Sequence, residues 1–222
     1  EMVDMALRKA DKDTVVMVLS DHGFAPFRRE FNLNTWLKEA GFHSLINPWR
    51  QGKDAFFANT NWSKTRAYNI GLNGLYINER GREAEGIVSA SEKESLMREI
   101  AAKLESMVDP KTGEHPVKKA YLAKDIYSGD QMAQSPDIVV GFNMGYRISW
   151  ASPSGRLPKE IITDNTEPWS GDHCVSPDVV PGIFLLNRKV NQTSPALYDL
   201  TPTILKAFGI ERPENMVGRS VL

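Results

Sequence analysis

Residues 14–24 read TVVMVLSDHGF, an apolar run that ends abruptly at two chemically active side chains. The run Thr14–Leu19 is uninterrupted and rich in β-branched residues, which is typical of a strand buried on both faces of a parallel sheet. In open parallel sheets, ligands bind beyond the carboxyl ends of the strands, where the chain turns away from the core. The stretch therefore predicts an α/β fold, and it places Asp21 and His22 where a site would form.

The flanking sequence predicts further elements of the same fold class. Apolar spacing and turn residues indicate helices at residues 1–12, 34–40, 91–107 and 196–208, and buried strands at residues 137–142 and 180–186. The helix at 91–107 is the best defined, because Ser91 and Glu94 form a capping-box pattern before an apolar stripe. We expect a three-layer core with a mostly parallel sheet and helices on both faces.

The chain reads as one domain. Its 222 residues show no internal repeat and no composition shift, so residues 1–222 are expected to form a single unit with an irregular insertion at about residues 45–86. The sequence opens on Glu1 inside a helical pattern, without a start methionine or signal peptide. We therefore expect an N-terminally truncated, C-terminal part of a longer protein, whose location, cytoplasmic or exported, stays open.

Charge and hydropathy exclude some classes of function. Lys and Arg number 27 against 28 Asp and Glu, giving a formal net charge of −1. Such a balance offers no electrostatic footprint for nucleic acid, so no nucleic acid binding is expected. The longest apolar runs fall well short of the roughly 20 residues that span a bilayer, so no membrane span is expected either.

Asp21 and His22 are candidate metal ligands. A carboxylate oxygen and an imidazole nitrogen together suit zinc or manganese, and Gly23 lets the backbone turn sharply behind them. The alternative is a hydrogen-bonded turn in which Asp21 caps backbone amides. The four residues alone leave both interpretations open.

A second candidate lies in the segment Trp169–His173, which reads WSGDH. Glycine and polar residues leading to a lone histidine indicate a ligand presented from a loop, and Asp172 is the candidate partner that would orient His173. The alternative is a loop histidine that packs under Trp169.

The combination of these stretches resembles the alkaline phosphatase superfamily, in particular its type I phosphodiesterase and nucleotide pyrophosphatase branch. The resemblance runs from about Thr14 to Leu222 and rests on SDHG after an apolar strand, GDH before a second strand, and the closing LYDLTPTIL helix. The stretches 31–37, 75–82 and 180–184 also match. This resemblance implies hydrolysis of phosphodiester or nucleotide pyrophosphate bonds in a small phosphate-ester or nucleotide substrate.

The resemblance also implies a two-metal site. In the family two divalent ions, usually zinc, with manganese as the alternative, lie about 4 Å apart and clamp the reacting oxygens. Asp21 and His22 match the ligands of one ion, and His173 matches a ligand of the other. The hydroxyl nucleophile and the remaining ligands would lie upstream. The isolated chain is therefore expected to bind zinc weakly or not at all and to lack turnover.

Other interpretations carry less support from the residues. Cofactor-independent phosphoglycerate mutases share SDHG, sulfatases belong to the same superfamily, and a non-catalytic interaction module is also open. Cys174 lies beside His173 and could act as a nucleophile, but no second base is evident.

The two other histidines and a group of aromatic residues are expected to be structural. His43 and His115 are predicted to be surface or loop residues rather than ligands. Trp49, Phe56, Phe57 and Trp62 could line a substrate pocket, although a small satellite core is favoured.

Overall fold

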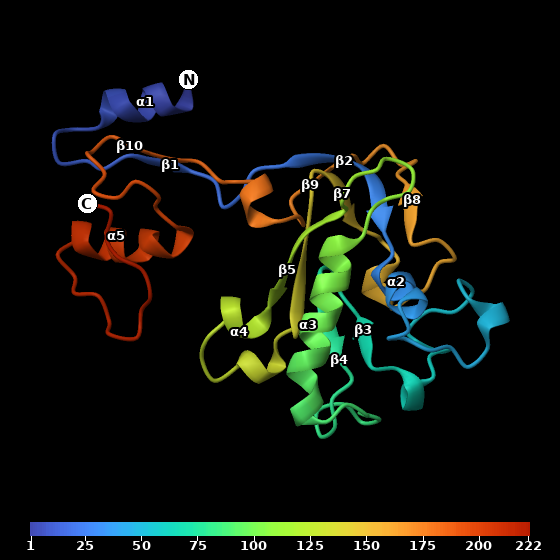
Figure 1. The fold of residues 1–222 in the computed structure, drawn as a ribbon. Coiled ribbons are helices and arrows are strands. Elements are labelled where there is room, and N and C mark those ends of the chain that lie inside the picture. The colour runs from blue at the N-terminus through green and yellow to red at the C-terminus, as the bar shows by residue number, and fades with distance from the viewer. The chain divides into compact units, whose positions relative to one another are not determined.

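The computed structural model describes all 222 residues, which divide into two compact units. Unit 1 comprises Glu1–Gly23 and Pro181–Leu222, and unit 2 comprises Phe24–Val180. Figure 1 labels the helices and strands of both units.

Unit 1 consists of two helices and a two-stranded sheet. Its elements are α1 (Met2–Lys9), β1 (Met17–Leu19), β10 (Phe184–Leu186) and α5 (Leu200–Ala207). The strands pair antiparallel, so the beginning and the end of the chain lie side by side in this sheet (Figure 1). Although α1 forms as predicted, none of its residues is buried.

The segment expected to be a fully buried strand is shorter and more exposed. Only Met17–Leu19 is a strand; Val18 is half-buried and Leu19 is 43% exposed. The second expected strand is likewise reduced to Phe184–Leu186, with Pro181 before it. The prediction of burial on both faces is wrong here because β1 has a single partner strand, which covers one edge and neither face.

Unit 2 contains the remaining helices and strands. They are β2 (Ala25–Phe31), α2 (Leu33–Glu39), β3 (Ala67–Asn69), β4 (Gly74–Ile77), α3 (Ala90–Ser106), β5 (Val117–Leu122), α4 (Ala123–Ile126), β6 (Ile138–Phe142), β7 (Gly145–Ile148), β8 (Ile162–Asp164) and β9 (Gly171–Asp172). Short 3₁₀ turns occur at Pro48–Arg50, Trp62–Lys64, Met132–Gln134, Ser152–Ser154 and Pro177–Val179.

Two four-stranded sheets organise unit 2. One has the order β3-β4-β6-β5 and is antiparallel throughout. The other has the order β7-β2-β8, with β9 also paired to β2; only β2 and β7 are parallel. The pairing of β2 with β9 joins the start of unit 2 to the segment that carries Asp172.

The sheets are therefore largely antiparallel, and the expected mostly parallel sheet is not confirmed. An apolar, β-branched run predicts that a strand is buried, but it carries no information on the direction of its neighbours. β6 illustrates this, because Ile138–Phe142 is buried as predicted and yet pairs antiparallel with β4 and β5. The mixed α/β composition itself agrees with the predicted class.

The hydrophobic core lies in unit 2. Alternate residues of β2, among them Phe27 and Phe31, point inward, as expected for a strand with one covered face. Helix α3 packs on β5 through Leu96, Ile100 and Leu104, which are at most 1% exposed. The predicted apolar stripe is thus confirmed.

Helix boundaries agree with the sequence to within a few residues. α2 ends before Gly41, which adopts the left-handed conformation with φ +82°. The capping box of α3 is formed by Ser89 and Glu92, two residues before the predicted pair. None of the helices combines the length and the apolar composition needed to cross a bilayer.

Candidate functional site

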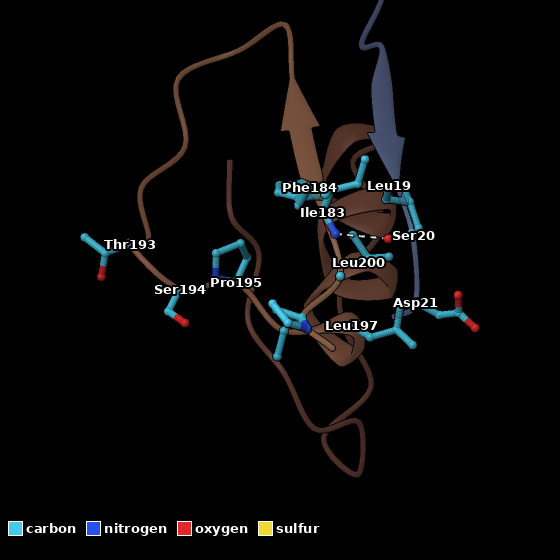
Figure 2. A pocket seen from close by; sticks show the side chains of 13 residues that line it. Leu19, Ser20, Asp21, Ile183, Phe184, Thr193, Ser194, Pro195, Leu197 and Leu200 are labelled. Carbon is cyan, nitrogen blue, oxygen red and sulfur yellow. Dashed lines mark hydrogen bonds between the residues drawn. The ribbon is translucent and has the colours of Figure 1, made fainter. Parts of the chain in front are cut away.

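The loop that carries Asp21 and His22 is fixed at its start by Ser20. The Ser20 amide donates to the Ile183 carbonyl over 3.0 Å, and the Ile183 amide donates back to Ser20 Oγ over 3.0 Å. Figure 2 shows this contact between the ends of the two strands. A Cβ at Gly182 would lie 2.5 Å from the Ser20 carbonyl oxygen, so only glycine fits there. The sequence places Asp21 and His22 directly after this clamp.

The side chains of Asp21 and His22 converge on each other. His22 Nε2 lies 3.4 Å from Asp21 Oδ2. His22 Nδ1 lies 2.9 Å from the carbonyl oxygen of Gly23, which can only accept a hydrogen bond. Nδ1 therefore carries the proton of the neutral ring, and Nε2 is the nitrogen that presents a lone pair.

The spacing of the pair can be compared with that of two zinc ligands. Two tetrahedral ligands at about 2.0–2.2 Å from zinc are separated by about 3.4 Å, which matches the observed spacing between Asp21 Oδ2 and His22 Nε2. The Asp21 side chain is 66% exposed and His22 is 30% exposed, so both are accessible. The pair has the donor atoms and the spacing of two ligands to a single ion.

A cavity of about 370 Å³ adjoins the same loop. Its lining includes Ser20 and Gly182 together with two residues that the sequence did not single out, Thr193 and Ser194. Figure 2 shows the Asp21 carboxylate pointing away from the other lining side chains. We therefore assign this cavity no role in metal binding. Nothing in the local sequence around Thr193 and Ser194 indicates a site.

His173 belongs to unit 2, where it directly follows β9. Its side chain is 45% exposed, and its ring meets Phe24 edge to face at 5.5 Å between centroids. Asp172 Oδ1 accepts hydrogen bonds from the amides of His173 and Cys174 at 2.7 and 2.9 Å, and it lies 3.9 Å from His173 Nδ1. Asp172 thus fixes the backbone of the turn rather than bonding directly to the imidazole.

The candidate ligands fall into the two separate units. Asp21 and His22 come together within unit 1, while His173 and Asp172 lie in unit 2. Within neither unit do three or more His, Cys, Asp or Glu side chains gather into a group that could hold a metal ion. The approach of His173 to Asp21 and His22 stays a prediction.

Cys174 has the wrong electrostatics for a nucleophile. Burial and the neighbouring Asp172 carboxylate raise the pKa of its thiol to about 11. The thiol is therefore protonated at neutral pH, and its reactive thiolate form is suppressed.

His43 lies in a loop, as expected, although it is buried rather than at the surface. It is 4% exposed, and its Nε2 lies 3.0 Å from Thr60 Oγ1. His115 is exposed as expected, and its Nδ1 donates to the Glu105 carbonyl. Neither histidine lies in a group that could hold a metal ion.

A family model for type I phosphodiesterase / nucleotide pyrophosphatase matches residues 1–159. The chain belongs to this family. The matched region includes Asp21 and His22 and ends before Asp172 and His173, so it covers the SDHG stretch but not the GDH stretch. No curated protein and no solved structure matches the chain. For members of this family, phosphodiesterase or pyrophosphatase hydrolysis is the activity that membership implies.

Proposed function

We propose that the protein hydrolyses phosphodiester or nucleotide pyrophosphate bonds in a metal-dependent reaction, with Asp21 and His22 as two ligands of one divalent ion. The observation that carries the proposal is the 3.4 Å spacing of Asp21 Oδ2 and His22 Nε2. The hydrogen bond from His22 Nδ1 to Gly23 supports it, because this bond selects the tautomer that a metal site needs. Family membership supports the reaction class.

The proposal includes His173 as a ligand of a second ion and Asp172 as its positioning residue. The amides of His173 and Cys174 donate to Asp172, so this carboxylate holds the turn in one conformation. A turn fixed in this way presents the His173 imidazole at little entropic cost. Asp172 would therefore act through the backbone of the turn.

Bound zinc, or manganese as the alternative, would supply Lewis-acid stabilisation of the charge that develops on phosphoryl oxygens. The chain's own residues would hold and orient the ion: Asp21 contributes negative charge and His22 contributes a neutral nitrogen. We assign no nucleophile within the chain, because the hydroxyl nucleophile is expected upstream of it. A small phosphate ester or nucleotide is the proposed substrate.

The test is an assay of the full-length gene product with bis(p-nitrophenyl) phosphate and p-nitrophenyl phosphate, each with and without chelator. Substituting a residue that orients a metal ligand typically lowers metal affinity or activity by about 10–100-fold, and a direct ligand should matter more. We therefore expect Asp21→Asn and His22→Ala each to lower kcat/KM by more than about 100-fold. His115→Ala removes an exposed histidine outside the site and should leave kcat/KM unchanged. Hydrolysis that resists the chelator, or that survives both site substitutions, would refute the proposal.

A further inference from the structure

A cluster of aromatic side chains in unit 2 stands apart from the proposed metal ligands. The rings of Phe57, Trp62 and Tyr68 lie 5.3–5.7 Å apart between centroids, and Tyr68 stands nearly perpendicular to both other rings, at 85° and 89°. The three rings thus pack against one another, and Tyr68 also stacks on Tyr76 at 5.5 Å between centroids. Trp49 and Phe56, which the sequence groups with these residues, are instead 90% and 80% exposed.

The backbone at Phe57 is held in an uncommon conformation. Phe56 and Phe57 have φ values of 51° and 58°, in the left-handed region that side chains with a Cβ rarely adopt. The Phe56 amide donates to the Ser154 carbonyl over 2.6 Å. At Gly155 a Cβ would come within 2.5 Å of the Phe57 ring, so this glycine leaves space for the ring. Two consecutive unfavourable conformations persist only where the surroundings enforce them, as they do at ligand-binding sites.

A cavity of about 310 Å³ lies against these rings. Besides the three aromatic residues, its lining consists of Ile70, Asn78, Glu83, Ala84 and Glu85. Asn78 is fully buried, and its amide nitrogen donates to carbonyl oxygens of Thr65, Trp62 and Glu85. Its Oδ1 is buried without a hydrogen-bond partner. This oxygen is not accessible from the cavity, so the charge that a ligand there would meet comes from Glu83 and Glu85.

The charged residues around the cavity carry an excess of negative charge. Arg82 and Lys93 form ion pairs with three carboxylates, those of Glu79, Glu83 and Asp137. Two cations therefore face three anions in this network, and Glu85 at the rim adds another carboxylate. No Lys or Arg is among the residues that line the cavity.

Tyr68 adds a neutral wall to the cavity. Its hydroxyl donates to Glu83 Oε1 over 3.2 Å. Burial, together with the Glu83 charge, raises the pKa of Tyr68 well above its ordinary value. The phenol therefore stays protonated, and its ring keeps the electron-rich face that attracts cations.

We propose that this cavity binds a small organic cation, an alkylated ammonium group, against the rings of Trp62, Tyr68 and Phe57. Aromatic faces attract such cations electrostatically, and a desolvated cavity strengthens the attraction. The carboxylates of Glu83 and Glu85 give the lining negative charge, which is complementary to a cation and repels an anion. The proposal is independent of the hydrolytic function, because all of these residues lie in unit 2 and none is a proposed metal ligand.

The test compares choline with 3,3-dimethyl-1-butanol, its uncharged isostere, by isothermal titration calorimetry on the full chain. Both ligands have nearly the same shape, so a difference in affinity reports the charge. We expect choline to bind at least about fivefold more tightly than the neutral analogue. Equal affinity for the two ligands would show that the pocket recognises only apolar shape, and the absence of choline binding would show that it is no cation site. Either result overturns the proposal.

Two substitutions locate the binding, and one serves as a control. Trp62→Leu should weaken choline binding by about tenfold, since it removes the largest ring face. Glu85→Gln should weaken choline binding by a few-fold and leave the neutral analogue unaffected; Glu85 is exposed, so this change should not disturb folding. Trp49→Leu alters an exposed tryptophan outside the cavity and should leave the affinity for choline unchanged. Unchanged choline affinity in the first two variants would overturn the assignment.

Discussion

Arg147 Nε lies 2.8 Å from Asp172 Oδ2, in an ion pair whose arginine is 1% exposed. The guanidinium also lies over two aromatic rings, at 3.8 Å from the Trp150 centroid and 5.0 Å from that of Phe27. The other oxygen of Asp172 accepts the amides of the turn that carries His173. One buried carboxylate thus links the arginine of β7 to a proposed ligand loop.

Arg147→Leu is expected to destabilise unit 2 by about 3–5 kcal/mol, because it leaves the Asp172 carboxylate buried and unpaired. It should also speed hydrogen exchange at the amides of His173 and Cys174, which Asp172 anchors. Urea unfolding measures the first effect and amide exchange measures the second. Arg156→Leu, at an exposed arginine, should stay within about 0.5 kcal/mol of the parent chain. Equal losses of stability in the two variants would show that the ion pair of Arg147 and Asp172 contributes no more to stability than an exposed arginine does.

The buried His43 predicts a dependence of stability on pH. Burial lowers the pKa of His43 from 6.5 to about 4. In the unfolded chain His43 gains its proton near pH 6.5, whereas the folded chain resists protonation until about pH 4. Between these values the unfolded state binds more protons, so the free energy of unfolding should fall by about 3 kcal/mol as the pH drops from 6.5 to 4.

Chemical denaturation across this pH range checks the effect. His43→Gln removes the titrating group and should flatten the decline, even if it lowers stability at every pH. His115→Gln should leave the slope of the parent chain intact, since His115 is exposed. A decline that persists unchanged in His43→Gln would assign it to other groups.

Asp137 is the central anion of the ion network that Arg82 and Lys93 form with three carboxylates. Its oxygens lie 2.6 Å from Arg82 Nη2 and 2.7 Å from Lys93 Nζ, and the Ile77 amide donates to Oδ2 over 2.7 Å. Burial alone would raise the pKa of Asp137, but these contacts outweigh it and hold the pKa below 3.8. The network therefore stabilises the fold above about pH 4 and loses this contribution as the pH falls through the lowered pKa.

Asp137→Asn should cost about 2–4 kcal/mol at neutral pH, because it removes the more deeply buried of the two carboxylates that Arg82 and Lys93 share. The matched control is Asp130→Asn, which changes an exposed aspartate. Thermal unfolding of both variants measures the difference. A shift in Tm no larger than that of the control would show that Glu79 and Glu83 suffice to neutralise Arg82 and Lys93.

The sequence predicts local features well where the deciding residues are neighbours. Asp21 and His22 are adjacent in the sequence, and their side chains lie 3.4 Å apart. The stripe of α3 follows from helical spacing alone. By contrast, the burial of His43 depends on Thr60 and on Phe57 and Trp62, which come from a later segment of the chain. A loop-like local pattern gives no sign of such coverage.

Strand direction was beyond the reach of local patterns for the same reason. The apolar content of β6 is set by its burial, whereas its antiparallel partners are set by the path of the connections. The clamp between Ser20 and Ile183 also joins residues that are 163 positions apart. The close approach of the Ser20 carbonyl explains why residue 182 is a glycine. A glycine in the sequence does not, however, reveal which segment approaches it.

Zinc titration of the chain tests the Asp21–His22 pair directly. Two ligands give an incomplete shell, so we expect weak zinc binding that His22→Ala and Asp21→Asn each reduce further. An imidazole must be neutral to bind a metal, so protons compete with zinc for His22 and any affinity should decline as the pH is lowered. Calorimetry near neutral pH and at about pH 5 measures both effects, with His115→Ala as the control.

Two tight sites in the isolated chain would contradict the incomplete shell. Binding that is unchanged at about pH 5 would argue that imidazoles are not the ligands.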